Sequence, residues 1–509
     1  MRRVFVGSLT PAARMGRNGN GGRPFVEARA LLLLMLAALA TSMMAMVLAS
    51  PPAQAANLIV SSPGATGAGT LQQRIIQANE NPGPDVILFL GLGSSATTIK
   101  QSSISQLPPI TDPSGLTIDG RNADITVSGP GDASSDQTFI VKGGAKLTIK
   151  NLTVTDGIPR PDLSGGAIAN NGTLAVDNST ITGNEANLGG GIQNNGTATV
   201  SNSTVSGNKA SSGGGGIYNA GTLHVDYSTV SKNTATEGGG GIYNAGTLVL
   251  FSSTISENTD NSLDGGTAST FGGGGINSAT GSTLTVSNST ITGNTAAYSG
   301  GAIQSDAAGA KVWNTTIAYN TSKKIAAGLS LRSQEMTLWN TLLAYNNNET
   351  SSSISVSNCS PSSLVINGSS NFDSNEDCNF GTANHSISKT DPELDVLLKD
   401  NGGPTQTLAL QLGSPAINHG NDAFAVDPYG AANPGGANPL KYDQRGQSFA
   451  RIANGAVDIG AYEYQVAVGS EPPPAEEPED KQACKKGGYE EFGFRNQGQC
   501  IKAVNHARR

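Results

Sequence analysis

The run Gly-Gly-Gly-Ile-Gln-Asn-Asn-Gly-Thr-Ala-Thr-Val-Ser-Asn-Ser-Thr-Val-Ser-Gly-Asn, residues 189–208, decides the fold. Variants of it recur through the middle of the chain and place an apolar residue every 24–27 positions, with one interval of 36. This column comprises Ile149, Val176, Val200, Val225, Leu250, Val286, Val312 and Leu338. A second column follows five residues later, at Val154, Ile181, Val205, Val230, Ile255, Ile291, Ile317 and Leu343. A period of this length predicts a solenoid of stacked coils.

Within each repeat, apolar and polar residues alternate, as Leu223 and Val225 do around His224 and Asp226. A period of two is typical of strands that bury one face. Because a single coil cannot bury that face alone, we expect the coils to stack around one continuous core. The sequence therefore predicts an all-β protein, a right-handed parallel β-helix.

A polar column separates the two apolar columns, at Asn151, Asn178, Asn202, Tyr227, Ser252, Asn288, Asn314 and Asn340. We expect asparagines at equivalent corners to hydrogen-bond to one another from coil to coil. Glycine runs such as 213–216 and 238–241 fit corners where a positive φ or a close approach excludes a Cβ. The interval of 36 predicts an inserted loop, for which Asp260–Phe271 is the candidate.

The N-terminus predicts export. Scattered arginines precede the apolar stretch Ala30–Ala49, and Ala53-Gln54-Ala55 has the form of a signal-peptidase site. We expect residues 1–55 to be a signal peptide cleaved before Ala56, which places the protein outside the cell or on its surface. An uncleaved membrane anchor is the alternative, because the apolar stretch is close to the length that spans a bilayer.

The rest of the chain divides by composition into five expected parts. A short helix is expected at 69–79, with Thr70 as its N-cap and Leu71, Ile75 and Ile76 on its apolar face. The expected parts are an N-terminal cap with the first coils at 56–145, repetitive coils at 146–350, a C-terminal cap at 351–465, a Pro/Glu linker at 466–482 and a two-cysteine tail module at 483–509.

The cysteines indicate the redox compartment of the protein, and the net charge limits the classes of partner it can bind. The simplest pairing closes two short loops, Cys359 with Cys378 and Cys484 with Cys500, and disulfides suit an oxidising compartment. Without residues 1–55, the chain has 25 basic and 38 acidic side chains. Such a surface repels phosphate backbones, so nucleic acid is excluded as a partner. We expect a monomer without a membrane span after signal cleavage.

Short motifs within the coils and in the segment after them resemble known families. The order of Asn401-Gly402-Gly403-Pro404, Asp443-Gln444-Arg445-Gly446 and Asp458-Ile459-Gly460-Ala461-Tyr462-Glu463 is similar to the choice-of-anchor Q domain of exported bacterial surface proteins. The Gly-Gly-Ala-Ile runs at Gly165 and Gly300 resemble polymorphic outer-membrane protein repeats, although Ile stands where those usually carry Phe. Together the resemblances imply a secreted or surface-displayed β-helix and no particular reaction.

The catalytic motifs known from β-helix enzymes are incomplete in this sequence. Asn258-Thr259-Asp260 matches the first motif of polygalacturonases, but the paired aspartates, Gly-His-Gly and Arg-x-Lys that should follow are missing. The four histidines, His224, His385, His419 and His506, are too scattered to predict a metal cluster or a catalytic triad. We therefore assign no catalytic residue and no metal ligand.

Two further motifs have competing interpretations. The run 373–377, Asp-Ser-Asn-Glu-Asp, alternates oxygen ligands like the start of a calcium loop, but Cys378 replaces the turn glycine, so a solvated loop closed by a disulfide is favoured. No cofactor other than this weak calcium candidate is expected. Arg445 and Asp458 are expected to pair within the C-terminal cap, because a buried charge needs a partner.

Aromatic residues supply the carbohydrate-binding candidates. Trp313 and Trp339 occupy the same outward position in consecutive coils, as do Tyr218 and Tyr243 beside a glycine corner. Such ladders can hold sugar rings, unless a loop or the terminal domain covers them. We expect a non-catalytic adhesive or polysaccharide-binding scaffold; a polysaccharide lyase or glycoside hydrolase, with its site near the insertion at Asp260, is the alternative.

Overall fold

The computed structural model describes residues 55–465 apart from 93–95, 122, 134–135, 263–271, 333–334, 351–352, 361–365, 381–383 and 430–437. Nearly all of the expected signal peptide, the linker and the two-cysteine module with Cys484 and Cys500 lie outside the described residues. Among the described residues, no helix is both long enough and apolar enough to cross a membrane.

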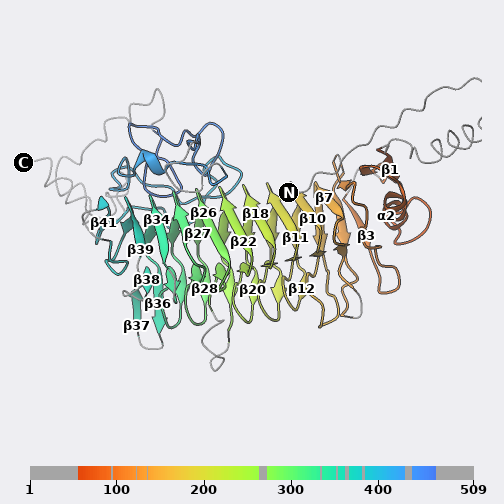
Figure 1. The fold of residues 1–509 in the computed structure, drawn as a ribbon, viewed down its shortest axis with the longest axis horizontal. Helices are drawn as coiled ribbons and strands as arrows, with labels where there is room; N and C mark the ends of the chain where they lie inside the picture. The colour runs from red at the N-terminus through yellow and green to blue at the C-terminus, as the bar shows by residue number, and fades with distance from the viewer. Residues whose placement is uncertain are drawn as a thin grey trace, which may run out of the picture. The chain divides into compact units, whose positions relative to one another are not determined.

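Four β-sheets run along the stack of coils (Figure 1). The first sheet contains, in order, β1 (Asn57–Val60), β2 (Asp85–Phe89), β4 (Leu116–Asp119), β7 (Lys146–Lys150), β10 (Thr173–Asp177), β14 (Thr197–Ser201), β18 (Thr222–Asp226), β22 (Thr247–Phe251), β26 (Thr283–Ser287), β30 (Ala310–Trp313), β34 (Met336–Trp339) and β39 (Ile366–Ser369). The second contains β3 (Thr97–Lys100), β5 (Ile125–Ser128), β8 (Leu152–Thr155), β11 (Thr180–Thr182), β15 (Thr204–Ser206), β19 (Thr229–Ser231), β23 (Thr254–Ser256), β27 (Thr290–Thr292), β31 (Thr316–Ala318), β35 (Leu342–Ala344), β40 (Phe372–Asp373) and β41 (Ile387–Ser388).

The other two sheets close each coil. The third contains β12 (Glu185–Ala186), β16 (Lys209–Ala210), β20 (Thr234–Ala235), β24 (Thr259–Asp260), β28 (Thr295–Ala296), β32 (Thr321–Ser322), β36 (Asn347–Thr350) and β37 (Ser353–Val356). The fourth contains β6 (Phe139–Val141), β9 (Ile168–Asn170), β13 (Ile192–Asn194), β17 (Ile217–Asn219), β21 (Ile242–Asn244), β25 (Ile276–Ser278), β29 (Ile303–Ser305), β33 (Leu329–Leu331) and β38 (Cys359–Ser360).

Neighbouring coils pair in parallel and in register. β14 pairs with β18 so that Val200 lies beside Val225, and β15 pairs with β19 so that Val205 lies beside Val230. All four valines are fully buried, so the two predicted apolar columns form the core. The predicted all-β parallel β-helix is confirmed. Within the described strands the exception to parallel pairing is the hairpin of β36 with β37.

The polar column of the repeat turns the chain from the first sheet to the second. All eight of its residues have a positive φ, between 47° and 54°. Asparagine tolerates this left-handed conformation better than most residues, which explains its recurrence here. The expected bonding between corners also occurs: the Nδ2 of Asn178 donates to Asn151, and the Nδ2 of Asn340 donates to Asn314.

A second asparagine column, which the sequence analysis did not single out, lies inside the stack. It comprises Asn184, Asn208, Asn233, Asn258, Asn294, Asn320, Asn346 and Asn358, each at most 1% exposed. Each Nδ2 donates to the Oδ1 of the next asparagine at 2.8–3.0 Å, and the last donates to Asp373 at 2.7 Å. A buried amide is costly unless it is bonded, so the stack itself satisfies this column.

The expected N-terminal helix is present as α2 (Leu71–Glu80). The side chain of Thr70 accepts a hydrogen bond from the backbone of Gln73, as an N-cap does. Leu71 and Ile75 are buried, whereas Ile76 is 43% exposed and lies off the predicted apolar face. The helix contacts β1 and β2, so it covers the first coils.

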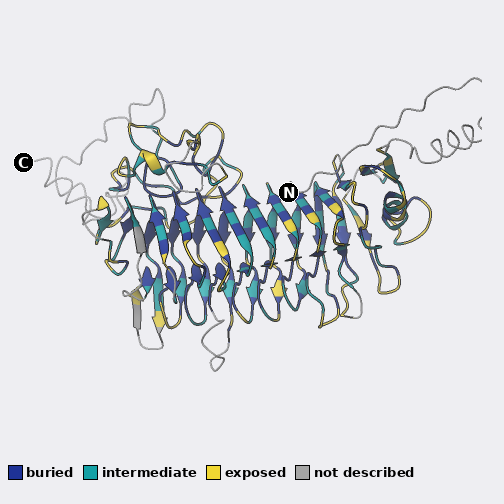
Figure 2. Cartoon of the chain, in the orientation of Figure 1, coloured by how far each residue is buried: buried dark blue, intermediate teal, exposed yellow. Residues whose placement is uncertain are grey.

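Residues 391–429 and 438–465 form the covering segment, which has little regular structure apart from the 3₁₀ helix η2 (Asp422–Phe424) and packs along one side of the stack (Figure 1). Corner asparagines bind it directly: the Nδ2 groups of Asn288, Asn314 and Asn340 donate to the carbonyls of Tyr442, Phe424 and Asn421. We call the coils that begin with β22, β26, β30 and β34 the covered coils, and those that begin with β7, β10 and β14 the open coils. Figure 2 shows how far the described residues of the coils are buried.

Candidate functional site

The two tryptophans lie in register, because Trp313 and Trp339 are paired residues of β30 and β34. Trp313 is only 3% exposed, and its indole Nε1 donates a 2.9 Å hydrogen bond to the carbonyl of Val426. The ring of Trp339 packs against Phe424, with 5.6 Å between the ring centroids. The covering segment therefore lies on this aromatic column, as one of the two interpretations of the sequence expected, and carbohydrate binding by the tryptophans stays a prediction.

The predicted tyrosine pair is stacked. Tyr218 and Tyr243 are paired residues of β17 and β21, and their rings lie 5.3 Å apart with planes 6° from parallel. Two rings that lie face to face each use one face on the other. One face of each ring is therefore covered by the other ring, and carbohydrate binding there stays a prediction.

A cleft of about 400 Å³ opens where the covering segment meets β18 and β22. We call it the junction cleft. It is lined by Tyr227, Phe251, Asp427, Asn438, Pro439, Leu440, Lys441 and Tyr442. Its volume falls within the range of roughly 300–1,000 Å³ that small-molecule sites occupy, and it combines aromatic rings with a few polar groups, as such sites do.

Tyr429 of the covering segment contacts the solenoid beside the junction cleft. Its hydroxyl donates to the carboxylate of Asp226, and its ring stacks on His224 with 5.3 Å between centroids. The His224 Nδ1 lies 3.2 Å from the same hydroxyl. The backbone N–H of Tyr429 donates to the Oδ1 of Asp427 at 2.8 Å. One residue thus bridges a carboxylate of the solenoid and a carboxylate of the covering segment.

The titrating groups here share a negative environment. Burial raises the pKa of Asp226, and the charge of Asp427 adds to this effect, while the Tyr429 hydroxyl and His224 oppose it. Burial also raises the pKa of Tyr227 and of Tyr429, and in both cases the charges of Asp226 and Asp427 contribute. Each of these shifts has the sign that nearby negative charge produces.

Tyr227 departs from the rule of its column. It has a φ of 49° at the corner where most coils carry asparagine, and a bulky side chain is unfavourable in that conformation. Its ring meets Phe251 edge to face, with centroids 5.4 Å apart and planes 77° apart. Phe251 in turn meets the ring of Tyr429 edge to face. The break in the asparagine column therefore builds the aromatic wall of the junction cleft.

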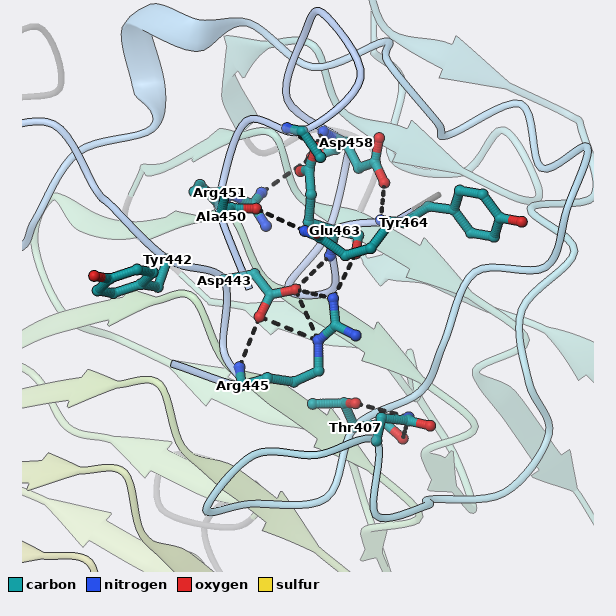
Figure 3. A network of polar contacts seen from close by, with 12 residues as sticks. Thr407, Tyr442, Asp443, Arg445, Ala450, Arg451, Asp458, Glu463 and Tyr464 are labelled. Atoms are coloured by element: carbon teal, nitrogen blue, oxygen red, sulfur yellow. Dashed lines mark hydrogen bonds and ion pairs between the residues drawn. The ribbon is translucent and has the colours of Figure 1, made fainter. Parts of the chain in front are cut away.

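A buried ionic pair lies next to Tyr442, on the wall of the cleft that the covering segment forms (Figure 3). Arg445 pairs with Asp443 at 2.6 Å, and their side chains are 3% and 0% exposed. The predicted Arg445–Asp458 pair is therefore wrong. Asp443 is two residues away and takes the guanidinium in bidentate fashion, whereas Asp458 accepts backbone N–H groups from Asn418 and Tyr464.

Arg451 and Glu463 complete this network. Arg451 is fully buried, and its NH2 group donates to the carbonyls of Asp458 and Gly460. Its backbone N–H donates to the carbonyl of Lys441, which fixes a residue that lines the cleft. Glu463 is fully buried, and burial raises its pKa to about 8, against the charge of Arg451 and with that of Asp458.

The loop that suggested calcium is closed by the predicted disulfide. Cys359 and Cys378 are bonded, which confirms that pairing. The carboxylate of Asp373 accepts hydrogen bonds from Asn358 at 2.7 Å and from the Cys378 N–H at 3.0 Å. Burial and the neighbouring Asp373 raise the pKa of Asp377 to about 6. These bonds organise the loop itself, and calcium binding stays a prediction.

Asp260, at the start of the predicted insertion, has a structural setting. It is fully buried, in the position that Ala235 and Ala296 occupy in the neighbouring coils. Its Oδ1 accepts hydrogen bonds from the N–H groups of Gly238 at 2.9 Å and Ser262 at 3.2 Å. The carboxylate therefore anchors the base of the insertion, most of which lies outside the described residues.

The histidines separate into two places. His224 lies beside the junction cleft, whereas His385 and His419 line a polar cavity of about 620 Å³ together with Asp422. His506 lies outside the described residues. In the part of the chain that the structure describes, no histidine belongs to a group of three side chains close enough to share a metal ion.

The sequence alone did not predict the junction cleft, although the wall that the solenoid contributes interrupts the repeat pattern. Tyr227 is visible as a break in a column otherwise filled by asparagine and serine, and Phe251 as an aromatic residue between Asp226 and Ser287 in the neighbouring column. The other wall comes from residues about 200 positions later, as the contact of Asp226 with Tyr429 shows. Spacing within a repeat carries no information about such a contact.

A known repeat family matches the coils of this chain. The Chlamydia polymorphic membrane protein (Chlamydia_PMP) repeat matches residues 202–220, 227–245 and 288–306. Each match begins at or beside the left-handed corner and ends after a strand of the fourth sheet. Among solved structures, the chain is similar to pectate lyase Pel9A, with 15% sequence identity, a TM-score of 0.44, and coverage of 81% of this chain and 98% of that chain. No curated protein matches the chain.

Proposed function

We propose that this protein is a surface-displayed scaffold that binds an extracellular polysaccharide at the junction cleft without catalysing a reaction on it. The observation that carries the proposal is the cleft of about 400 Å³ lined by Tyr227, Phe251, Asp427, Asn438 and Tyr442. Aromatic faces pack against the C–H groups of a sugar ring, and carboxylate and amide groups bind its hydroxyls.

Surface display is supported by the repeats. The matched repeat model describes a membrane protein of chlamydiae, which points to a surface or outer-membrane protein. The motifs of the covering segment resemble the choice-of-anchor Q domain, and we extend that resemblance to the proposal that the covering segment belongs to this class. Secretion through a cleaved signal peptide and a monomeric state are parts of the same proposal.

The test is a glycan array probed with the full chain and with Tyr227→Asn. This variant installs the residue that the same corner carries at Asn202 and Asn288, so the backbone remains compatible while the aromatic wall is lost. We expect binding to fall by roughly tenfold or more, the equivalent of about 1.4 kcal/mol. Tyr298→Ser, which removes an aromatic ring of the solenoid outside the cleft lining, is the control and should retain binding. Equal binding by Tyr227→Asn and the unaltered chain would refute the proposed site.

One observation favours an enzyme as the second candidate. Asp226 has a raised pKa, accepts a hydrogen bond from Tyr429 and lies beside His224, so it can hold a proton next to a sugar-sized cleft. If the protein cleaves glycans, incubation with neutral and acidic polysaccharides should release new reducing ends, and Asp226→Asn should abolish them. No release by the unaltered chain would leave the binding scaffold.

A further inference from the structure

The walls of the junction cleft favour positive charge. Asp427 lines the cleft and Asp226 lies beside it, and the charges of both contribute to the raised pKa values of Tyr227 and Tyr429 after the larger effect of burial. Among the described residues that line the cleft, Lys441 is the one cationic side chain. An anionic ligand would bring further negative charge into this environment, and a cation would be attracted.

The aromatic rings of the cleft also favour a positively charged ligand. The edge-to-face contact of Tyr227 with Phe251 keeps their ring faces at a steep angle to each other, and Tyr442, which is 38% exposed, lies on the opposite wall. The face of an aromatic ring carries negative partial charge and attracts an ammonium group. Carboxylate and aromatic faces in one cleft are the groups that recognise an amine.

The same chain already holds a cation in this way. The guanidinium of Arg445 lies 3.9 Å from the ring centroid of Phe449 and 3.9 Å from that of Tyr462. The carboxylate of Asp443 completes the site at 2.6 Å. The junction cleft presents the same three kinds of group without a guanidinium among its lining residues.

We infer that the junction cleft takes a hexosamine unit with a free amine, as found in a partly deacetylated amino-sugar polymer. This inference rests on the proposed function. The ammonium would lie between Asp427 and the ring of Tyr227, and the amide of Asn438 would meet the sugar hydroxyls. A uronic acid would be repelled, and an N-acetylated sugar would lose the charged contact.

The experiment is a calorimetric titration of the full chain with hexamers of β-1,4-linked glucosamine, N-acetylglucosamine and α-1,4-linked galacturonate. We expect the glucosamine hexamer to bind at least roughly tenfold more tightly than the other two, and its affinity to fall with added salt. Asp427→Asn should weaken this binding roughly fivefold to tenfold, whereas Lys441→Gln should tighten it.

Glu237→Gln controls for attraction by the overall acidic surface, because it removes an exposed carboxylate of the solenoid outside the cleft lining. Equal weakening by Glu237→Gln and Asp427→Asn would overturn the inference. Tighter binding of the acetylated or galacturonate hexamer would overturn it as well, and would leave glycan binding itself intact. If none of the hexamers binds, the inference fails, and the glycan array decides separately whether the proposed glycan-binding function stands.

Discussion

The open coils and the covered coils share one backbone and differ in what lies against it. At the left-handed corner, Asn178 and Asn202 are exposed in the open coils, whereas Asn288 and Asn314 are fully buried in the covered coils. One residue before the corner, the open coils carry Lys150, Asp177 and Ser201, and the covered coils carry Phe251, Ser287, Trp313 and Trp339. The coils therefore stack in the same way with and without the covering segment against them, and three of the four covered coils carry an aromatic residue at this outward position.

The largest expected difference between the two regions concerns this outward position. Trp313→Ala removes a buried ring from a covered coil and should lower the free energy of unfolding by about 3–5 kcal/mol. Ser201→Ala at the equivalent position of an open coil should change it by less than about 0.5 kcal/mol. Urea denaturation of both variants makes the comparison, and similar values for the two would show that the covering segment adds no stability there.

The next effect concerns the covering segment alone. Arg445→Ala leaves the buried Asp443 without its partner and should cost about 3 kcal/mol. The hydrogen bonds and ring contacts described for Arg445 lie within the covering segment, so limited proteolysis should cut residues 391–465 of the variant first and leave the solenoid resistant. If the variant has an unchanged melting temperature, the structural role of the pair is refuted.

Substitutions in the inner asparagine column should destabilise the open and the covered coils equally. Asn208→Ala in an open coil and Asn320→Ala in a covered coil each leave buried partners without a hydrogen bond, so each should cost about 1–3 kcal/mol. We expect the two costs to agree within about 0.5 kcal/mol in chemical denaturation. A much larger cost for Asn320→Ala would mean that the covering segment also stabilises the interior.

The two regions should also respond to pH with opposite signs. In the covering segment, burial raises the pKa of Glu463 to about 8, so the folded state binds more protons than the unfolded state above pH 4.5. Stability should therefore fall as pH rises from about 4.5 to about 8, by at most about 1.4 kcal/mol per pH unit for this group. Glu463→Gln should flatten this slope in thermal unfolding monitored from pH 5 to 9.

In an open coil the sign is reversed. Burial acts to raise the pKa of Asp177, but hydrogen bonds from Asn202 and Lys150 outweigh it, and the pKa lies below its ordinary value. The contribution of Asp177 is therefore present above pH 3.8 and is lost as pH falls. An Asp177→Asn variant should lose this sensitivity to acid, and a slope that is unchanged below pH 4 would contradict the assignment.

The repeat made the solenoid predictable, because both apolar columns and the left-handed corner recur at nearly constant spacing. Cys359 and Cys378 were also predictable, since they lie close in sequence. The position of the covering segment was not, because contacts such as Trp313 with Val426 join residues more than 100 positions apart. The error about Arg445 has the same origin: the motifs showed that the charges would be buried and carried no geometry to choose between Asp443 and Asp458.

The covering segment also sets where the protein can change length. Phe424 lies on Trp339, Val426 on Trp313 and Tyr429 on the coil of Asp226, so the segment spans a fixed number of coils. Gain or loss of a coil within that span would displace these residues of the covering segment from the side chains they contact. Beyond it, towards the N-terminus, one repeat resembles the next, and a whole coil can be duplicated or deleted without disturbing the junction. Length can therefore evolve in units of one coil on one side of the cleft alone.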